Sequence, residues 1–355
     1  MLPDFKSSPL QSDTSFTTRC ECFIEYFEAY LADLLKNLDS EVCEYASQVC
    51  LAGGKRIRPL LAYNFASSPA GRNLANFEGL MKASAVLEMV HVATLVHDDI
   101  LDDASTRRGT STLHQTLGTH QAVLLGDALF SYALELASEF PTAQICRIVA
   151  RATKRTCSGE IRQTFSRGSY DVSMDQYVGF INDKTGELFS AACEIGSLLG
   201  GEDNETCKIS ADFGLSLGVN YQVYDDLIDA FGEPKKSGKT LRSDWNSGKI
   251  TLPLILLLRS ACREDHERVA SLLSTNETEG NNSVLRNIEI FEFFEKYDIL
   301  PECTSFLLGR YEHTLSLVNR LPNPSVQKNL GEFLASFSDK FASVHTLKTS
   351  NFLAC

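Results

Sequence analysis

The sequence predicts an all-α protein, a single large helical bundle packed around a central cavity. Apolar residues recur at helical spacing along most of the chain, whereas strand-like alternation with β-branched residues is scarce. The helical segments are 22–51, 79–103, 121–139, 143–166, 174–200, 205–231 and 250–273, with several more within 284–346. The 355 residues are 43% hydrophobic, which is enough to bury a large core.

The beginning of the chain and three later segments lack this pattern. Residues 1–18 have no apolar core of the kind found in signal peptides, so we expect a disordered leader and then one helical domain over 19–350. Turn-forming residues predict connections at 67–76, 232–249 and 274–283. Because no run of about 18 consecutive apolar residues occurs, we expect no membrane-spanning helix.

The net charge and the cysteine content argue against certain partners and metal sites. A net charge of −13 argues against nucleic acid as a partner, because phosphate backbones select basic surfaces. The 11 cysteines are scattered, and no Cys or His pair has zinc-binding spacing. We therefore expect reduced thiols and a cytoplasmic location, with targeting to an organelle left open.

Segment 87–109, LEMVHVATLVHDDILDDASTRRG, is an apolar helix that runs into four aspartates. Helical spacing places four side chains in one stripe: His91, Thr94, Asp98 and Asp102. Two carboxylates one turn apart repel each other unless a cation lies between them, and Mg²⁺ prefers such oxygen ligands. The alternative is an acidic helix end exposed to solvent.

Segment 213–232, FGLSLGVNYQVYDDLIDAFG, repeats the arrangement with Asp226 in its acidic end. One face of this helix would carry Gly218, Gln222, Asp225 and Asp229. Two such helices facing each other would form a carboxylate-lined mouth above an apolar cavity. A solvent-exposed acidic patch does not need apolar flanks twice, so the repeat favours metal binding.

Basic residues follow at defined places. The segment GGKRIRP presents Lys55, Arg56 and Arg58 after paired glycines, either as an anion site or as the charged start of a helix. Arg107 and Arg108 come just after the first acidic cluster. They either neutralise the adjacent aspartates or bind phosphates that the metal ions also contact.

Two further basic positions lie in later segments. Lys184, beside Thr185, interrupts an apolar helix, where a lysine either extends to solvent or meets a buried anion. Lys239 and Lys249 each follow a glycine in the loop after the second acidic helix and are its stronger anion-binding candidates. Carboxylate clusters, hard cations and these bases together predict a diphosphate site, and the apolar helices predict a hydrocarbon attached to the diphosphate. The chemistry would be loss of the diphosphate, with metal ions and cations stabilising the leaving oxygens.

These motifs resemble those of the trans-isoprenyl diphosphate synthases, the polyprenyl synthetase family, of the long-chain type. The resemblance is closest over about residues 50–255 and rests on GGKRIRP, HDDILDD followed by RRG, AVLLGDALF at 122–130, KTGELF at 184–189, and YQVYDDLID through GKITLP. It implies the isoprenoid synthase fold, a homodimer, and stepwise addition of isopentenyl diphosphate to an allylic diphosphate. It also implies Mg²⁺, about three ions per site.

The resemblance assigns roles to the residues that match the family's motifs. Metal binding falls to Asp98, Asp102, Asp225 and Asp229, and the catalytic set is completed by Asp99, Asp226 and Lys184. The allylic diphosphate or its leaving group would be held by Arg107, Lys184, Thr185, Gln222, Lys239 and Lys249. Isopentenyl diphosphate would be held by Lys55, Arg58, His91 and Arg108.

Some positions depart from the family's pattern. Arg242 stands where the family frequently has glycine and Trp245 where leucine is usual, so we expect the geometry of this loop to differ. Tyr221 replaces the commoner phenylalanine, which should matter little. His97 and His114 have no ligand spacing and are interpreted as structural.

Residues of the first acidic helix partly predict the length of the product. In the family, bulky aromatics four and five residues before the first aspartate stop chain growth, and here those positions hold the small Thr94 and Ala93, with Val90 further down. One isoprene unit adds about 5 Å, close to one helix turn, so an open floor permits further additions. We expect a product longer than twenty carbons, of thirty or more.

Two other functions compete with this interpretation. A class I terpene cyclase also begins with an Asp-rich helix, but it usually carries an Asn/Ser/Glu-type second metal motif. A non-catalytic regulatory subunit of a heteromeric prenyltransferase would have damaged Asp motifs. Both Asp motifs are intact here.

Overall fold

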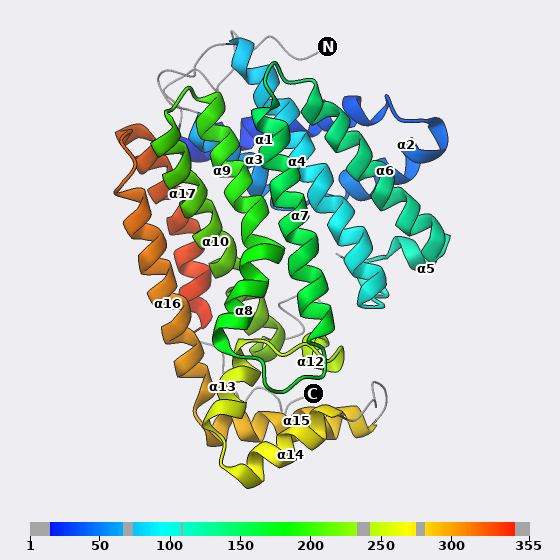
Figure 1. The fold of residues 1–355 in the computed structure, drawn as a ribbon, viewed down its shortest axis with the longest axis vertical. Coiled ribbons are helices and arrows are strands. Elements are labelled where there is room, and N and C mark those ends of the chain that lie inside the picture. Colours follow the sequence, from blue (N-terminus) through cyan, green and yellow to red (C-terminus); the bar gives the residue numbers. More distant parts are fainter. Residues whose placement is uncertain (1–14, 67–73, 108, 233–241, 275–280, 345–355) are drawn as a thin grey trace. The chain divides into compact units, whose positions relative to one another are not determined.

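The computed structural model describes residues 15–66, 74–107, 109–232, 242–274 and 281–344 (Figure 1). The regular secondary structure of these residues is helical apart from one hairpin of two-residue strands, β1 (Thr106–Arg107) and β2 (Thr110–Ser111). The all-α prediction is confirmed. Contacts divide the chain into two compact units: unit 1 comprises 1–155, 186–215 and 316–333, and unit 2 comprises 156–185, 216–315 and 334–355.

Unit 1 is built around the long helix α4 (Leu74–Leu101), which contacts α6 (Thr119–Ser138) most extensively. Two other helices also contact α4: α3 (Ile57–Ala66) and α9 (Glu187–Leu199). The remaining helices of this unit are α1 (Phe16–Leu35), α2 (Ser40–Cys50), α5 (Leu113–Leu117) and the first parts of α7 (Ala143–Phe165) and α10 (Asn204–Phe231), together with the helical residues of 316–333.

Unit 2 holds the C-terminal parts of α7 and α10 together with α8 (Met174–Ile181), which runs directly into a π-helical turn, η4 (Asn182–Gly186). Its other helices are α12 (Ser243–Asn246), α13 (Leu252–Ser260), α14 (Arg263–Ser274), α15 (Asn281–Lys296), most of α16 (Ile299–Val318) and the second half of α17 (Pro324–Ser343). Helix α13 contacts both α8 and α15, and α14 contacts α15.

Several helix boundaries differ from those that periodicity predicts. The Ser15 hydroxyl accepts a hydrogen bond from the Thr18 backbone nitrogen at 3.2 Å, and this cap starts α1 at Phe16. Residues 16–18, expected in the leader, are therefore the first turn of α1. The segment expected as one helix over 22–51 is two helices, because α1 ends at Leu35 and α2 begins at Ser40.

Helix α4 is the core helix of unit 1. Val86, Val90 and Ala93 have no exposed surface. Its segment Phe77–Leu101 has the length and the mean hydropathy, 1.4, of a membrane span, but 72% of that apolar window is buried inside the protein. No other helix in the described ranges meets the same length and hydropathy test.

Candidate active site

The end of α4 carries the first pair of predicted metal ligands. The Asp102 backbone nitrogen donates to the Asp98 carbonyl at 2.9 Å, so helical geometry continues past Leu101 and the two aspartates share a face. Both aspartates are half-buried, as are Thr94 and His91, which lie one and two turns before Asp98. The predicted stripe is therefore present as a single partly open face of the helix.

Asp99 lies off that stripe and is bound by Arg107. The Asp99 side chain is 9% exposed, and Arg107 in strand β1 places Nε 2.7 Å from its Oδ1 and Nη2 2.6 Å from the same oxygen. Arg107 thus pairs with Asp99 rather than with Asp102 or Asp103, the neighbours that charge alone suggested. The Asp103 carboxylate instead lies 3.7 Å from His114 Nε2.

His97, next to the first acidic cluster, packs against helix α6. Its Nε2 lies 3.1 Å from the Val123 carbonyl, and a Cβ added at Gly126 would lie 2.1 Å from the same nitrogen. Gly126 belongs to the AVLLGDALF segment, and its missing side chain makes room for the imidazole. This contact fits the structural role expected for His97.

The GGKRIRP segment is fixed by its middle arginine. Arg56 is 3% exposed and has a φ of +43°, and its guanidinium donates to Glu28 Oε1 at 2.5 Å, Glu88 Oε1 at 2.7 Å and the Cys50 carbonyl at 2.7 Å. Burial opposes its charge, but the hydrogen bonds and charges of both glutamates raise the pKa of Arg56. The residue ties α1, α2 and α4 to the start of α3.

The other two basic residues of this segment are oriented differently. Lys55 is exposed. Arg58 is 9% exposed and lies in the first turn of α3, with its guanidinium carbon 4.8 Å from the ring centroid of Phe189. The helix start that charge patterning offered as an alternative is real, since α3 begins at Ile57.

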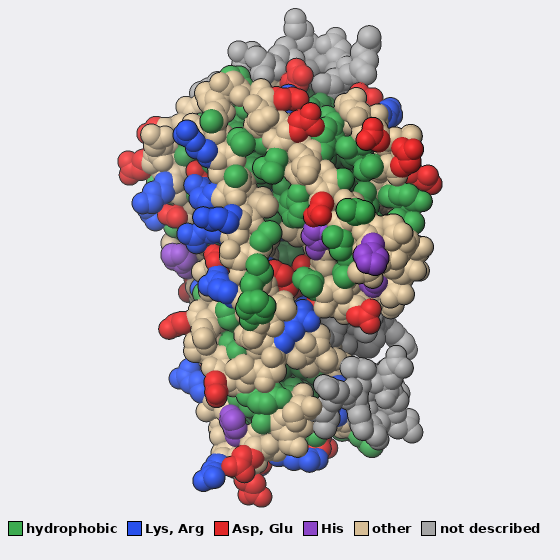
Figure 2. Space-filling model, turned by 45° about the vertical axis from the view of Figure 1, so that its right-hand side comes forward, with side chains coloured by type: hydrophobic (Ala, Val, Ile, Leu, Met, Phe, Trp, Pro, Cys, Tyr) green, Lys and Arg blue, Asp and Glu red, His purple; other side chains and the backbone are tan. Residues whose placement is uncertain are grey.

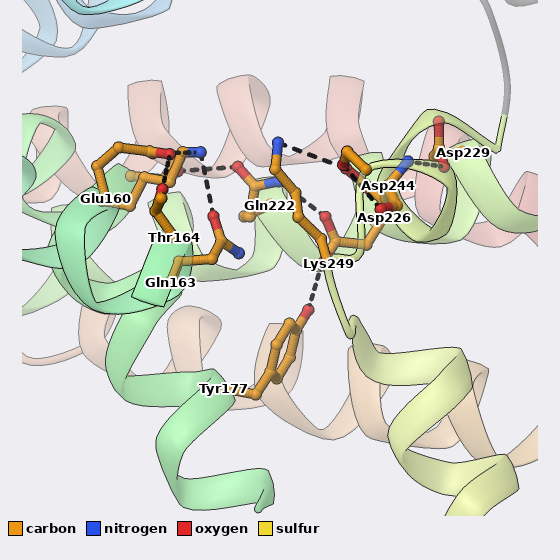
Figure 3. A network of polar contacts seen from close by, with 12 residues as sticks. Glu160, Gln163, Thr164, Tyr177, Gln222, Asp226, Asp229, Asp244 and Lys249 are labelled. Atoms are coloured by element: carbon orange, nitrogen blue, oxygen red, sulfur yellow. Dashed lines mark hydrogen bonds and ion pairs between the residues drawn. The ribbon is translucent and has the colours of Figure 1, made fainter. Parts of the chain in front are cut away.

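In unit 2, Lys184 lies on the π-helical turn and does not extend to solvent. Its side chain is 17% exposed, pairs with the carboxylate of Glu160, and donates to Gln163 Oε1 at 3.1 Å (Figure 3). A Cβ added at Gly159 would lie 2.5 Å from the Lys184 backbone nitrogen, so α7 approaches the turn closely. The π-turn interrupts the helix expected over 174–200 at the position of Lys184 and Thr185.

A chain of hydrogen bonds links this turn to the second acidic helix. The Thr185 hydroxyl donates to Gln222 Oε1 at 2.8 Å, Gln222 Nε2 donates to Asp226 Oδ1 at 2.8 Å, and the Tyr177 hydroxyl donates to Asp226 Oδ2 at 2.6 Å. Asp226 is 3% exposed and Tyr177 is not exposed at all. Asp225, by contrast, is half-buried.

Burial controls the ionisation of Asp226 and Tyr177. It raises the pKa of Asp226 well above its usual range, helped by the negative charges of Asp244 and Asp225, while hydrogen bonds from Tyr177 and Gln222 oppose the rise. Burial and the adjacent Asp226 also raise the pKa of Tyr177 well above the usual tyrosine value. The phenol therefore keeps its proton and remains a hydrogen-bond donor.

Asp229 is held by the segment that follows the second motif. Its Oδ2 accepts from the Asp244 backbone nitrogen at 3.3 Å, and its carbonyl accepts from the Arg242 nitrogen at 3.1 Å. Lys249 is 7% exposed, donates its backbone N–H to the Asp244 carbonyl at 2.9 Å, and places Nζ 3.9 Å from Asp244 Oδ1. Asp244 thus connects the second motif to Lys249 (Figure 3).

Both unusual residues in this segment have structural explanations. Arg242 has a φ of +64°, the left-handed region that favours glycine, and its guanidinium carbon lies 5.2 Å from the ring centroid of Phe291. Trp245 is 3% exposed, donates Nε1–H to Asn287 Oδ1 at 3.0 Å and packs against Phe291 and Phe294. An aromatic cluster therefore accommodates the tryptophan.

The comparison with known proteins decides the family. The sequence profile of polyprenyl synthetases matches residues 39–290. The chain belongs to the polyprenyl synthetase family. It is thereby placed among the enzymes that transfer prenyl groups.

Individual relatives agree with this assignment. The chain is 30% identical over 275 residues to the short chain isoprenyl diphosphate synthase of Methanothermobacter thermautotrophicus, covering 76% of this chain and 82% of that protein. It is 34% identical over 218 residues to heptaprenyl diphosphate synthase component 2 of Geobacillus stearothermophilus, covering 61% and 66% of the two chains. The crystal structure of a polyprenyl synthase from Caulobacter crescentus, complexed with calcium and isoprenyl diphosphate, superposes with a TM-score of 0.79 at 26% identity, over 94% of this chain and 97% of that one.

The acidic motifs of this polyprenyl synthetase have donor sets suited to Mg²⁺. Asp98 and Asp102 offer only carboxylate oxygens on one partly open helix face, and Asp225 and Asp229 are likewise half-buried. Among the described residues, no group of three or more His, Cys, Asp or Glu side chains could enclose a metal ion. Half-buried pairs of carboxylates fit an ion that completes its shell with water and substrate phosphates.

Sequence reasoning missed four residues of the unit 2 network: Glu160, Gln163, Tyr177 and Asp244. The available signal for Tyr177 was its place in an apolar helix, because a buried phenol needs a hydrogen-bond partner. Two predicted ligands, Arg108 and Lys239, lie outside the described residues.

Proposed function

We propose that this polyprenyl synthetase condenses isopentenyl diphosphate head-to-tail with an allylic diphosphate and releases pyrophosphate at each addition. The observation that carries the proposal is the presence, in a member of this family, of two oxygen-only carboxylate pairs. Asp98 lies on α4 and Asp102 lies one turn later, just past the end of that helix, while Asp225 and Asp229 lie on α10. A class I cyclase would not need the exposed Lys55 site of a second diphosphate.

Different residues would bind each of the two substrates. Lys184 and Thr185 on the π-turn, with Lys249 and Arg107, would bind the allylic diphosphate and stabilise the charge that grows as it leaves. Lys55, Arg58 and His91 would hold isopentenyl diphosphate. Its double bond would attack the allylic carbocation, and a proton lost to the departing pyrophosphate would complete the addition. Water must stay out of the site, because it would quench the cation.

The proposed cofactor is Mg²⁺. Asp98 and Asp102 would bind it through one motif, and Asp225 and Asp229 through the other. When bound, the ions would neutralise the diphosphate oxygens and assist departure of the leaving group. The calcium and isoprenyl diphosphate in the Caulobacter crescentus relative support a hard cation beside this class of ligand.

We propose a product longer than twenty carbons, of about thirty or more. The heptaprenyl name of one relative supports this length, and so do the small Ala93 and Thr94 before the first motif. Another relative is named as a short chain synthase, so the length of the product has to be measured by chromatography.

We propose a homodimer assembled through helix α6. This helix exposes Val123 (38%), Leu124 (66%) and Leu134 (41%), beside Leu101 (49%) at the end of α4. Figure 2, in which the right-hand side of Figure 1 comes forward, shows hydrophobic side chains exposed among acidic ones on this face. Light scattering after size exclusion should give twice the chain mass of 39.2 kDa, and Leu124→Glu should shift the species to monomer.

A heteromer is the second candidate assembly, favoured by the name "component 2" of the Geobacillus stearothermophilus relative. One experiment separates the possibilities. The purified chain is incubated with Mg²⁺, labelled isopentenyl diphosphate and allylic primers of several lengths, and the products are resolved by chromatography. Elongated diphosphates support the proposed function, hydrocarbons indicate a cyclase, and turnover only with a partner indicates a regulatory subunit. Excess EDTA should abolish elongation.

A further inference from the structure

The buried Tyr177 has no role in the chemistry proposed above, yet it contacts the second acidic motif directly. It comes from α8, whereas the aspartates lie on α10, and its hydroxyl donates to Asp226 Oδ2 at 2.6 Å. No surface of this tyrosine is exposed. A phenol in that position needs a partner, and a carboxylate is the strongest acceptor available.

Asp226 is turned inward by this contact. One of its oxygens accepts from Tyr177, the other accepts from Gln222 Nε2 at 2.8 Å, and the residue is 3% exposed. With both oxygens occupied by neutral donors, Asp226 is oriented as a structural link, unlike its half-buried neighbours Asp225 and Asp229.

The link continues to the π-turn. The amide oxygen of Gln222 accepts the Thr185 hydroxyl at 2.8 Å, so three successive hydrogen bonds join α8, α10 and η4. Thr185 is 9% exposed and follows Lys184, whose ammonium lies between Glu160 and Gln163. Figure 3 shows Tyr177, Gln222 and Asp226 in this arrangement. These hydrogen bonds form one connected chain. Removing the Tyr177 hydroxyl therefore leaves the buried Asp226 carboxylate with one hydrogen-bond partner fewer.

We propose that Tyr177 is a positioning residue for pyrophosphate binding. Acting through Asp226 and Gln222, it holds the Lys184–Thr185 turn in register with the α10 face that carries Asp225 and Asp229. The ligand class is the diphosphate leaving group with its metal ion, so the inference rests on the proposed function. Tyr177 itself touches neither substrate nor metal.

Tyr177→Phe tests this role, with Tyr311→Phe as the matched control. Tyr311 is a second buried tyrosine of unit 2, and its hydroxyl donates to the Leu334 carbonyl at 3.1 Å. Titration calorimetry with inorganic pyrophosphate and Mg²⁺ gives a readout independent of turnover. We expect Tyr177→Phe to bind pyrophosphate about tenfold more weakly, while Tyr311→Phe binds as the wild type does. The KM for isopentenyl diphosphate should stay within about twofold in both variants.

A second variant shows whether the effect passes along the chain of hydrogen bonds. Gln222→Met breaks it one step further on, so the double variant Tyr177→Phe/Gln222→Met should bind pyrophosphate no more weakly than Gln222→Met alone. Additive losses would overturn the inference. Should Tyr177→Phe lack a cooperative urea transition, Gln222→Met alone carries the test, and wild-type pyrophosphate affinity in that variant would overturn it.

The outcomes also separate this inference from the proposed function. If the wild-type chain binds no pyrophosphate with Mg²⁺, both fall. If the wild type binds it and elongates prenyl diphosphates, but Tyr177→Phe binds equally well, only the role of Tyr177 falls.

Discussion

Arg107 holds Asp99 by both carboxylate oxygens, with Nε 2.7 Å from Oδ1 and 2.9 Å from Oδ2. This contact joins the β1–β2 hairpin to the first acidic cluster through an Asp99 side chain that is only 9% exposed. Arg107→Ala should lower the free energy of unfolding by about 1–2 kcal/mol, since it leaves a buried carboxylate without its cation. Urea denaturation followed by circular dichroism measures the change.

The control for this variant is Arg263→Ala. Arg263 pairs with Glu267 at 3.0 Å on the surface, with side chains 93% and 66% exposed, so its removal should cost less than about 0.5 kcal/mol. Equal stability of Arg107→Ala and wild type would mean that Asp99 does not depend on the arginine.

Gly126→Ala should disturb the first metal motif from the neighbouring helix. The added methyl would lie 2.1 Å from His97 Nε2, so the imidazole next to Asp98 must move. We expect a loss of about 1–3 kcal/mol in unfolding free energy, together with a higher Mg²⁺ concentration for half-maximal activity. Gly79→Ala is the control in the same unit, because its methyl would meet side chains at 3.7 and 3.8 Å, ordinary contact distances. A Gly126→Ala protein as stable as Gly79→Ala would contradict the packing argument.

Sequence periodicity predicted the helices well and their interruptions poorly. The stripe of His91, Thr94, Asp98 and Asp102 could be predicted because a helix of uniform pitch fixes which residues share a face. The π-turn at Lys184 could not, because it depends on the close approach of α7 at Gly159, a contact between segments distant in sequence.

The ion pairs also could not be predicted from the sequence, because they depend on the fold. Charge alone suggested Asp102 or Asp103 as the partner of Arg107, whereas the hairpin turns its guanidinium to Asp99. Tyr177 and Glu160 escaped notice because their partners, Asp226 and Lys184, lie 49 and 24 positions along the chain, and only the fold brings them together.

Burial predicts which cysteines react. Burial raises the pKa of Cys50 to about 12 and that of Cys207 to about 11, so both thiols stay protonated at pH 8, and the thiolate is the nucleophile. Cys157 and Cys262 are exposed. Iodoacetamide at pH 8, followed by peptide mass mapping, should therefore modify Cys157 and Cys262 and spare the other two.

The same shifts make stability depend on pH. In the unfolded chain these thiols ionise near their ordinary pKa of about 8.5, whereas in the folded chain they hold their protons to about 11 or 12. The folded state therefore loses stability as pH rises above about 8.5. Cys50→Ala/Cys207→Ala should show a shallower loss between pH 8.5 and 11; an identical slope would contradict the shifts.

Glu160→Gln should tighten pyrophosphate binding. Glu160 and Lys184 are 13% and 17% exposed and paired, so the carboxylate competes with any phosphate for the ammonium. Removing its charge should raise the affinity for pyrophosphate with Mg²⁺ severalfold and lower the unfolding free energy by about 1–3 kcal/mol. The control is Glu187→Gln, whose carboxylate lies 3.5 Å from Arg155 Nε and should not affect binding. Weaker pyrophosphate binding by Glu160→Gln would mean that the Glu160 carboxylate orients the Lys184 ammonium for binding.

Ala93→Phe should shorten the product by at least one isoprene unit. Ala93 has no exposed surface, and Val90 on the same helix has none either, so a phenyl ring there must occupy space on the inner side of α4. We expect a cost of about 1–3 kcal/mol from overpacking, measured by urea denaturation, alongside the shorter product measured by chromatography.

The control for product length is Thr94→Val, which keeps the side-chain volume. The Thr94 hydroxyl donates to the His91 carbonyl at 2.7 Å, so it is already engaged within its own helix. This variant should leave the product distribution unchanged. If a folded Ala93→Phe protein also makes the wild-type distribution, the growing chain does not pass Ala93, and the residues that stop growth lie on another helix.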